Sequence, residues 1–292
     1  LTEDEFWFSI SDSDLLLWLQ GVNVTKKYDV VIDEIDVCPV QIQGPLSEDL
    51  MAKLAGEELR DVPYYGIMET QVGGADVVIS QTGFTGEKGY EIYVRDAHQN
   101  AEKVWNAVLE GGEEFGLMVI APAHHRRIAA GILSWGQDLD HETSPFQVNL
   151  AYQVPRNKKA DYIGKEALEK QRAMIDEGTP PFKMRMVGIT LGGKEITDYA
   201  PDFWLIADMD GNDVGYVTSP WWSPELGTNI ALAWVPWSSS EIGTKYQVRL
   251  PDEFSESPGV PVGAEIVDVP FRESVNPNKR EVQSAKGLDF AD

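Results

Sequence analysis

Residues 81–94 read QTGFTGEKGYEIYV and join a glycine-rich turn to a strand that carries a carboxylate. Glycine adopts positive φ without steric cost, so Gly83, Gly86 and Gly89 predict a tight backbone with positive φ. Such a turn brings the strand that follows it close to another surface. We therefore expect this stretch to shape a binding site as well as the fold.

The strand GYEIYV predicts one apolar face and one polar face, because successive side chains of a strand point to opposite sides. Tyr90, Ile92 and Val94 fall on one face. Glu91 and Tyr93 fall on the other. A carboxylate beside an aromatic ring suits a flat heterocycle that presents paired N–H donors. Glu91 is the first candidate for a ligand contact.

The composition describes a globular, acidic chain. Its 292 residues are 42% hydrophobic, and this length predicts two domains, or one large domain with an appendage. The net charge of -24 argues against nucleic acid and anionic membranes as partners, because both are polyanions. Neither an apolar run of eighteen residues nor a secretory signal is visible, so the expected location is cytoplasmic. One cysteine, Cys38, excludes an internal disulfide framework, and the four histidines lack metal-ligand spacing, so we expect no metal.

Alternating strand and helix patterns in the first half predict an α+β fold. In chain order they begin with a strand over residues 5–10, a helix capped by Asp12 and a strand-rich stretch over 28–44. A helix capped by Ser47, before Glu48 and Asp49, and a hairpin with arms 66–72 and 76–81 around Gly73 and Gly74 come next. The carboxylate strand, a helix from His98 and a second helix over 123–133 follow.

The second half changes character after residue 155. Residues 156–182 are charged and contain a short amphipathic helix, and after Pro181 short β runs alternate with turns. Six runs (184–191, 203–209, 212–219, 229–235, 245–250 and 264–269) predict a small antiparallel barrel or jelly roll. The domain prediction is an α+β region over 1–155, a helical connector over 156–182, a barrel over 183–275 and a polar tail over 276–292.

Several motifs in order resemble the aminomethyltransferase family, which includes the T-protein of the glycine cleavage system and folate-dependent demethylases. Besides residues 81–94, these are QIQGP at 41–45, HRRIAAGILSWGQDLD at 125–140, YIGKEAL at 162–168, and YVTSPWWSP with NIALAWV between 216 and 235. The resemblance implies a cloverleaf of ferredoxin-like antiparallel subdomains with a small C-terminal β-barrel, and a tetrahydrofolate cofactor. It makes residues 1–155 the folate-binding region.

The resemblance places the glutamate that holds the pterin at Glu91. One carboxylate can accept both neighbouring N–H donors of the 2-amino-4-oxopyrimidine edge, which agrees with that role. The family's catalytic aspartate would lie upstream of Leu1, so the N-terminal part of the family fold is expected to be missing. No catalytic acid or base is assigned within residues 1–292.

Five further positions follow from the resemblance as cofactor or substrate contacts. Phe84 stands where the family commonly has a tyrosine lining the folate cavity, and Tyr93 shares a strand face with the carboxylate. Ser9 falls where the T-protein commonly has an asparagine, and it is equally an ordinary strand serine. Tyr64 or Tyr65 is expected beside the reacting one-carbon group, with rim packing as the alternative.

Arg127 matches the second of two family arginines, and the first is replaced at Ala123 or His124. An arginine fork stays charged and bonds a carboxylate bidentately, so the resemblance makes Arg127 a partner of the folate benzoylglutamate tail.

The implied activity is transfer of a methyl or aminomethyl unit from a small donor to N5 of tetrahydrofolate. Residues 6–14 and 134–146 are similar to demethylases that act on dimethylsulfoniopropionate, whereas FTGEKG at 84–89 is closer to the glycine-cleavage enzyme. The donor therefore stays open, and a true T-protein would also use a lipoyl carrier protein. The alternatives are a non-catalytic folate-binding protein of the iron–sulfur-assembly type and the folate domain of a larger demethylating oxidase.

Overall fold

The computed structural model describes residues 1–10, 14–198 and 202–272 of the chain. These described residues divide into two compact units. Unit 1 comprises those within 1–83, 88–119 and 134–136, and unit 2 comprises those within 84–87, 120–133 and 137–272. The predicted cap Asp12 and the predicted polar tail over 276–292 lie outside the described residues. The four-part domain division stays a prediction.

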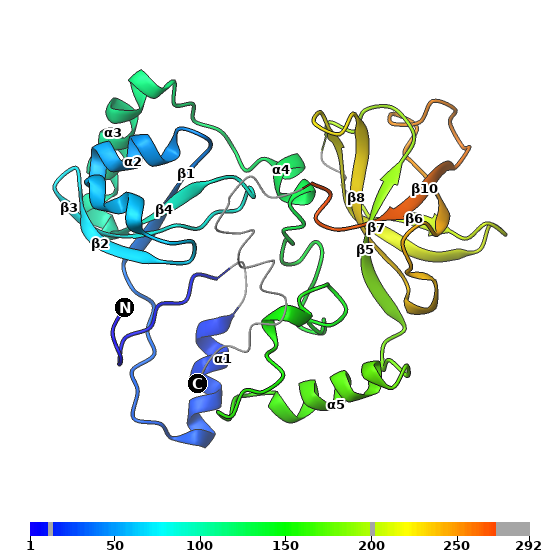
Figure 1. Ribbon diagram of the computed structural model, residues 1–292, viewed down its shortest axis with the longest axis horizontal. Coiled ribbons are helices and arrows are strands. Elements are labelled where there is room, and N and C mark those ends of the chain that lie inside the picture. The colour runs from blue at the N-terminus through cyan, green and yellow to red at the C-terminus, as the bar shows by residue number, and fades with distance from the viewer. Residues whose placement is uncertain (11–13, 199–201, 273–292) are drawn as a thin grey trace. The chain divides into compact units, whose positions relative to one another are not determined.

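Unit 1 is a four-stranded antiparallel sheet with helices, labelled in Figure 1. Its elements are α1 (Leu15–Lys26), β1 (Val37–Gln43), α2 (Ser47–Ala55), a 3-10 helix (Glu57–Asp61), β2 (Ile67–Val72), β3 (Ala75–Ser80), β4 (Gly89–Arg95), α3 (Ala97–Gly112) and a second 3-10 helix (Glu113–Phe115). The strand order is β1-β4-β3-β2, so the carboxylate strand β4 is an inner strand.

One face of this sheet carries the core of unit 1. Tyr90, Ile92 and Val94 are fully buried and pack with side chains from α2 and α3, such as Leu50 and Val104. Helices α2 and α3 cover this face (Figure 1). Burying an aliphatic side chain of this size contributes about 1.5–3 kcal/mol, which fixes the register of β4. The predicted alternation of the strand is confirmed.

The β2–β3 hairpin also forms as predicted. Gly73 and Gly74 have φ of 60° and 75°, and both central positions of a type I′ turn require positive φ. The pairing of Val72 with Ala75 closes the hairpin. The helix predicted from Ser47 is α2, but Leu46 occupies the N-cap position and the Ser47 hydroxyl donates to the Lys88 carbonyl, so Ser47 is not the cap.

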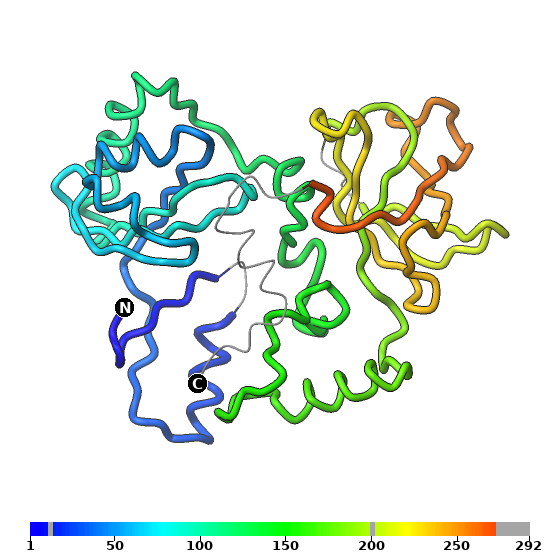
Figure 2. The backbone as a smooth tube through the Cα atoms, in the orientation of Figure 1, coloured from blue at the N-terminus to red at the C-terminus, as the bar shows by residue number. Residues whose placement is uncertain are grey.

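The strand predicted over residues 5–10 is wrong. Those residues follow an irregular path, the blue start of the tube in Figure 2. They meet the sheet through side chains: the Trp7 ring lies 4.6 Å from the Arg95 guanidinium carbon. A segment that crosses the face of a sheet cannot extend its hydrogen-bond ladder, so the apolar alternation gave the wrong element. Similarly, β1 begins only at Val37, late in the stretch predicted to be rich in strands.

Unit 2 contains a closed six-stranded antiparallel barrel of order β10-β5-β8-β7-β6-β9, as predicted. Its elements are α4 (His124–Ala129), a 3-10 helix (Ala151–Gln153), α5 (Lys165–Asp176), β5 (Met184–Leu191), β6 (Trp204–Ala207), β7 (Asp213–Ser223), β8 (Thr228–Pro236), a 3-10 helix (Trp237–Ser239), β9 (Lys245–Val248) and β10 (Val262–Val267). Closure leaves no sheet edge open to pairing. The fold is α+β with a C-terminal barrel.

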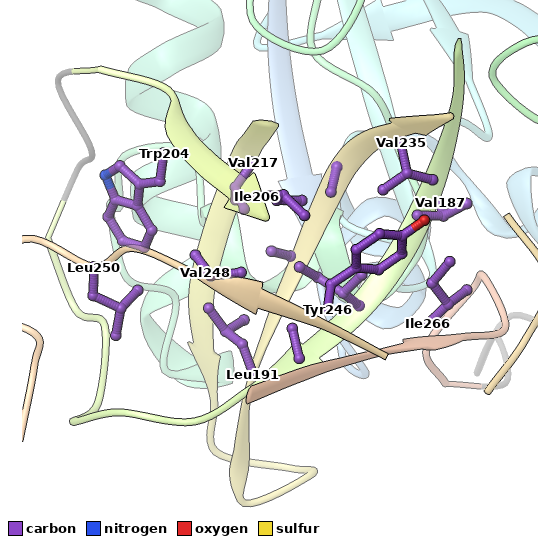
Figure 3. Close-up of a cluster of buried hydrophobic side chains, with 14 of the residues drawn as sticks. Val187, Leu191, Trp204, Ile206, Val217, Val235, Tyr246, Val248, Leu250 and Ile266 are labelled. Carbon is purple, nitrogen blue, oxygen red and sulfur yellow. The ribbon is translucent and has the colours of Figure 1, made fainter. Parts of the chain in front are cut away.

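The barrel interior is filled by apolar side chains from all six strands, including Ile206, Val235 and Val248 (Figure 3). Strand β8 is buried on both faces. Its Ala231 and Ala233 face that interior, whereas Ile230, Leu232 and Trp234 pack in a second cluster with α4. This double burial explains why NIALAWV is an almost continuous apolar run.

The helix predicted over 123–133 is the shorter α4. It ends before Gly131, which has φ of 68° and cannot continue a right-handed helix in that conformation. The amphipathic helix of the connector is α5. No helix among the described residues is long and apolar enough to cross a bilayer.

Candidate functional site

The second face of the unit 1 sheet carries the predicted carboxylate. Glu91 pairs with Gln41 of β1 and Ser80 of β3, so these three side chains form a polar row across β1, β4 and β3. Glu91 and Tyr93 are both half-buried and point away from the apolar core. The Tyr93 hydroxyl donates to Glu91 Oε2 at 3.2 Å. The structure therefore brings these two predicted residues together.

A second donor reaches the same oxygen. The Thr82 hydroxyl donates to Glu91 Oε2 from the turn that follows β3. Both donors meet Oε2, and an ionised carboxylate has about four lone-pair sites over its two oxygens. Among the described residues, Glu91 Oε1 is left without a donor. It can accept hydrogen bonds from a ligand.

The N-terminal segment reaches the same face. Ser9 is exposed and makes a side-chain hydrogen bond with Tyr93. Burial raises the Tyr93 pKa, the bond with Ser9 opposes that shift, and the nearby Glu91 charge adds to it. The phenol is therefore neutral and can donate at physiological pH. Ser9, Tyr93 and Glu91 form a continuous polar chain.

The glycines of the turn act differently from the prediction. Only Gly86 has positive φ, at 74°, so the expectation is wrong for Gly83 and Gly89. A Cβ on either residue would lie within 2.2 Å of the Gln43 side-chain amide. The Gln43 side chain occupies the space beside the Cα atoms of Gly83 and Gly89, and a larger residue at either position would have to displace it. From there Gln43 Nε2 donates to the Thr82 carbonyl at 3.1 Å.

Tyr64 and Tyr65 are adjacent, with ring centroids 4.2 Å apart. Tyr65 has φ of 65°, a left-handed conformation that is uncommon for an aromatic residue and costs roughly 1–3 kcal/mol. Its backbone N–H donates to the Gln81 carbonyl at 3.2 Å. This bond ties the tyrosine turn to the residue before Thr82. The strained backbone is consistent with a constrained site.

Phe84 and Arg127 belong to unit 2. Phe84 is half-buried in the turn between β3 and β4. The Arg127 side chain is 1% exposed and forms an ion pair of 2.7 Å with Asp138, whose side chain is 0% exposed. Arg127 also donates to Ser219 Oγ at 2.8 Å. The prediction that Arg127 binds folate carboxylates stays a prediction.

The Asp138 carboxylate is the centre of a buried polar cluster in unit 2. Its Oδ1 accepts from the Thr218 and Ser219 hydroxyls, both at 2.6 Å. The strand register of β7 shifts between Val217 and Ser219, and such a bulge redirects a side chain. The indole of Trp234 donates to the Asp138 carbonyl at 2.9 Å. The cluster joins α4, the loop after it and the barrel.

A hollow of about 520 Å³ lies along the unit 1 sheet, lined by Glu69, Thr70, Gln71, Asp76, Val77 and Arg95. Glu91 is not among these residues. Glu91 is a candidate ligand contact because of its hydrogen bonding and its position on the sheet. The sequence analysis did not predict Thr82 or Gln43 as site residues, although Gln43 lies in the QIQGP motif and Thr82 in the stretch 81–94.

Two family models match the chain. Residues 1–158 match the GCVT N-terminal domain, and residues 185–271 match the glycine cleavage T-protein C-terminal barrel domain. The chain belongs to the glycine cleavage T-protein family. The second match coincides with the closed barrel of unit 2, and the first contains the sheet that bears Glu91.

Curated relatives carry two names. A dimethylsulfoniopropionate demethylase, DmdA, of Ruegeria pomeroyi is 34% identical over 86% of this chain and 66% of its own length. An aminomethyltransferase of Chloroherpeton thalassium is 30% identical over 93% of this chain and 73% of its own length. An aminomethyltransferase of Listeria monocytogenes is 32% identical over 92% and 72% respectively. The chain thus spans about two-thirds to three-quarters of the length of these relatives.

A solved structure shares the fold. The glycine cleavage system aminomethyltransferase T from Bartonella henselae superimposes with a TM-score of 0.67 at 23% identity, covering 88% of this chain and 66% of that one. T-protein architecture is therefore present in unit 1 and unit 2 of this family member.

Proposed function

We propose that this chain carries out tetrahydrofolate-dependent one-carbon transfer, as an enzyme of the EC 2.1 class. Family membership and the names of the relatives support this. The observation that carries the proposal is Glu91: a strand carboxylate on the sheet face opposite the core, held by two donors on Oε2, with Oε1 open to a ligand. This acceptor suits the paired N–H donors of a reduced pterin.

The residues present fit tetrahydrofolate at its pterin end. Glu91 would accept from the pyrimidine edge, while Tyr93 and Ser9 would lie on the same face of the sheet. Tyr64 or Tyr65 would stand beside the reacting carbon, and the role of Phe84 in lining the folate cavity stays a prediction from the resemblance. When bound, the cofactor supplies the N5 amine that accepts the one-carbon unit. Positioning then provides much of the rate acceleration.

A small methyl donor is favoured over a carrier protein. The net charge of -24 repels an acidic protein, whereas a zwitterionic sulfonium or betaine donor carries no net charge and is not repelled. The similarity to a protein named dimethylsulfoniopropionate demethylase points to the same class. We therefore propose a methyl donor of the sulfonium type, with aminomethyl transfer from a lipoyl carrier as the second candidate, favoured by the aminomethyltransferase relatives.

The test offers dimethylsulfoniopropionate, glycine betaine, dimethylglycine and aminomethyl-lipoate in turn, with tetrahydrofolate, and identifies the folate product. A methyl donor gives 5-methyltetrahydrofolate, whereas the glycine-cleavage reaction gives the 5,10-methylene form. Reactions without protein control for spontaneous transfer. Folate binding with no product from any donor would favour the non-catalytic alternative.

A further inference from the structure

The turn before β4 contains a hydroxyl that touches the candidate ligand carboxylate. Thr82 Oγ1 donates to Glu91 Oε2, and Tyr93 donates to the same oxygen. The two donors differ in how they are held. A firmly held donor keeps the carboxylate in place, whereas a loosely held donor can be displaced by a ligand.

Thr82 is anchored on both sides. The Gln43 amide donates to its carbonyl at 3.1 Å, and the same amide fills the space that Cβ atoms on Gly83 and Gly89 would need. The preceding residue, Gln81, pairs through its backbone with Gly66. A threonine hydroxyl turns about one side-chain torsion, so an anchored backbone fixes its direction within a few rotamers.

Tyr93 is held less firmly. Its bond to Glu91 Oε2 measures 3.2 Å, longer than the usual 2.7–2.8 Å or so for O–H···O bonds. Its hydroxyl has a second partner in Ser9, which lies in an irregular segment. Loss of the contact with Glu91 would therefore leave the phenol still hydrogen-bonded.

We propose that Thr82 is a positioning residue that fixes the Glu91 carboxylate for the pterin, and that Tyr93 occupies the place on Oε2 that the ligand takes. This inference rests on the proposed function. With Thr82 retained and Tyr93 displaced, Oε1 and one site on Oε2 face the ligand. A bidentate pair with two adjacent N–H donors needs that arrangement.

The test measures binding of 5-formyltetrahydrofolate, a stable reduced folate, by titration calorimetry. Thr82→Val keeps the shape and removes the donor, and we expect affinity to fall about tenfold or more, because hydrogen bonds to ionised groups are among the strong ones. Thr82→Ser restores the hydroxyl and should restore binding. Tyr93→Phe should change affinity by less than about threefold.

Two controls separate positioning from general damage. Thr70→Val removes a hydroxyl from another half-buried threonine of the same sheet, whose partner is the Ala55 carbonyl at 3.5 Å, and should leave affinity unchanged. Adding Thr82→Val to Glu91→Gln should weaken binding by no more than about twofold, because the hydroxyl acts through the carboxylate.

The results discriminate between the two proposals. Affinity unchanged in Thr82→Val, no recovery in Thr82→Ser, or a larger loss in Tyr93→Phe than in Thr82→Val overturns the positioning role while folate binding stands. Wild-type protein that binds no reduced folate overturns the proposed function and this inference with it. If Thr82→Val lowers folate affinity in the wild-type background but not in Glu91→Gln, both the positioning role and the proposed function are supported.

Discussion

Replacing Arg127 with methionine tests whether this arginine holds unit 2 together. Its side chain is 1% exposed, and its three nitrogens donate to His124, Ile132, Asp138, Gln137 and Ser219. Methionine fills much of the same volume but leaves the buried Asp138 carboxylate without its ion-pair partner. Breaking one side of a buried ion pair costs about 3–5 kcal/mol, so we expect the free energy of unfolding to fall by roughly that amount.

The assay is urea unfolding followed by tryptophan fluorescence; the chain has nine tryptophans, and one of them, Trp234, donates to the Asp138 carbonyl. Arg249→Met is the control: its pair with Asp213 is about half-exposed, and we expect little change. Replacing both Arg127 and Asp138 with apolar residues should recover part of the loss. If Arg127→Met lowers the free energy of unfolding by less than about 1 kcal/mol, the structural role is refuted and the predicted contact with the folate tail is favoured.

Two further predictions concern unit 2. Gly86→Ala should destabilise the protein by about 2 kcal/mol or more, because alanine is strained at φ of 74° and its methyl would meet a neighbouring alanine Cβ at 2.4 Å. Gly227 also has positive φ but has open space around it, so Gly227→Ala should lower the melting temperature less than Gly86→Ala does. Burial and nearby arginines lower the pKa of His124 and His125, so the unfolded chain binds more protons below about pH 6.5 and stability falls as pH drops through that value. Replacing both histidines with glutamine should reduce the dependence of the melting temperature on pH, whereas His141→Gln, at an exposed position, should leave it unchanged. An unchanged pH dependence in the double variant would contradict the role given to His124 and His125.

Local patterns predicted the strands and their faces. The Glu91 strand alternates because burial of Tyr90, Ile92 and Val94 is worth several kcal/mol, roughly 1.5–3 for each side chain, and this signal lies within six residues. The six barrel strands were predictable for the same reason. Residues 5–10 show the limit: alternation describes which side chains meet a surface, and it cannot tell a paired strand from a segment lying across one.

The support of the candidate site could not be predicted locally. The contact between Gln43 and Thr82 joins residues 39 positions apart. The Gln43 side chain also occupies the space that a Cβ atom on Gly83 or Gly89 would fill. A glycine in a sequence pattern can indicate positive φ or the close approach of another chain segment, and the pattern alone does not separate the two causes. Arg127 shows a related limit, because burial and an acidic partner at Asp138 appear only in the fold.

Glu91→Gln is the most direct test of the central claim, that this carboxylate binds the pterin edge of a reduced folate. We predict that calorimetry with 5-formyltetrahydrofolate will show affinity lowered by a few kcal/mol, about 2–3, because the amide accepts at only one of the two oxygen positions. The matched control is Glu69→Gln, an exposed glutamate of the same sheet paired with Arg95, which should bind as wild type does. Equal affinity in Glu91→Gln and wild type would contradict the claim.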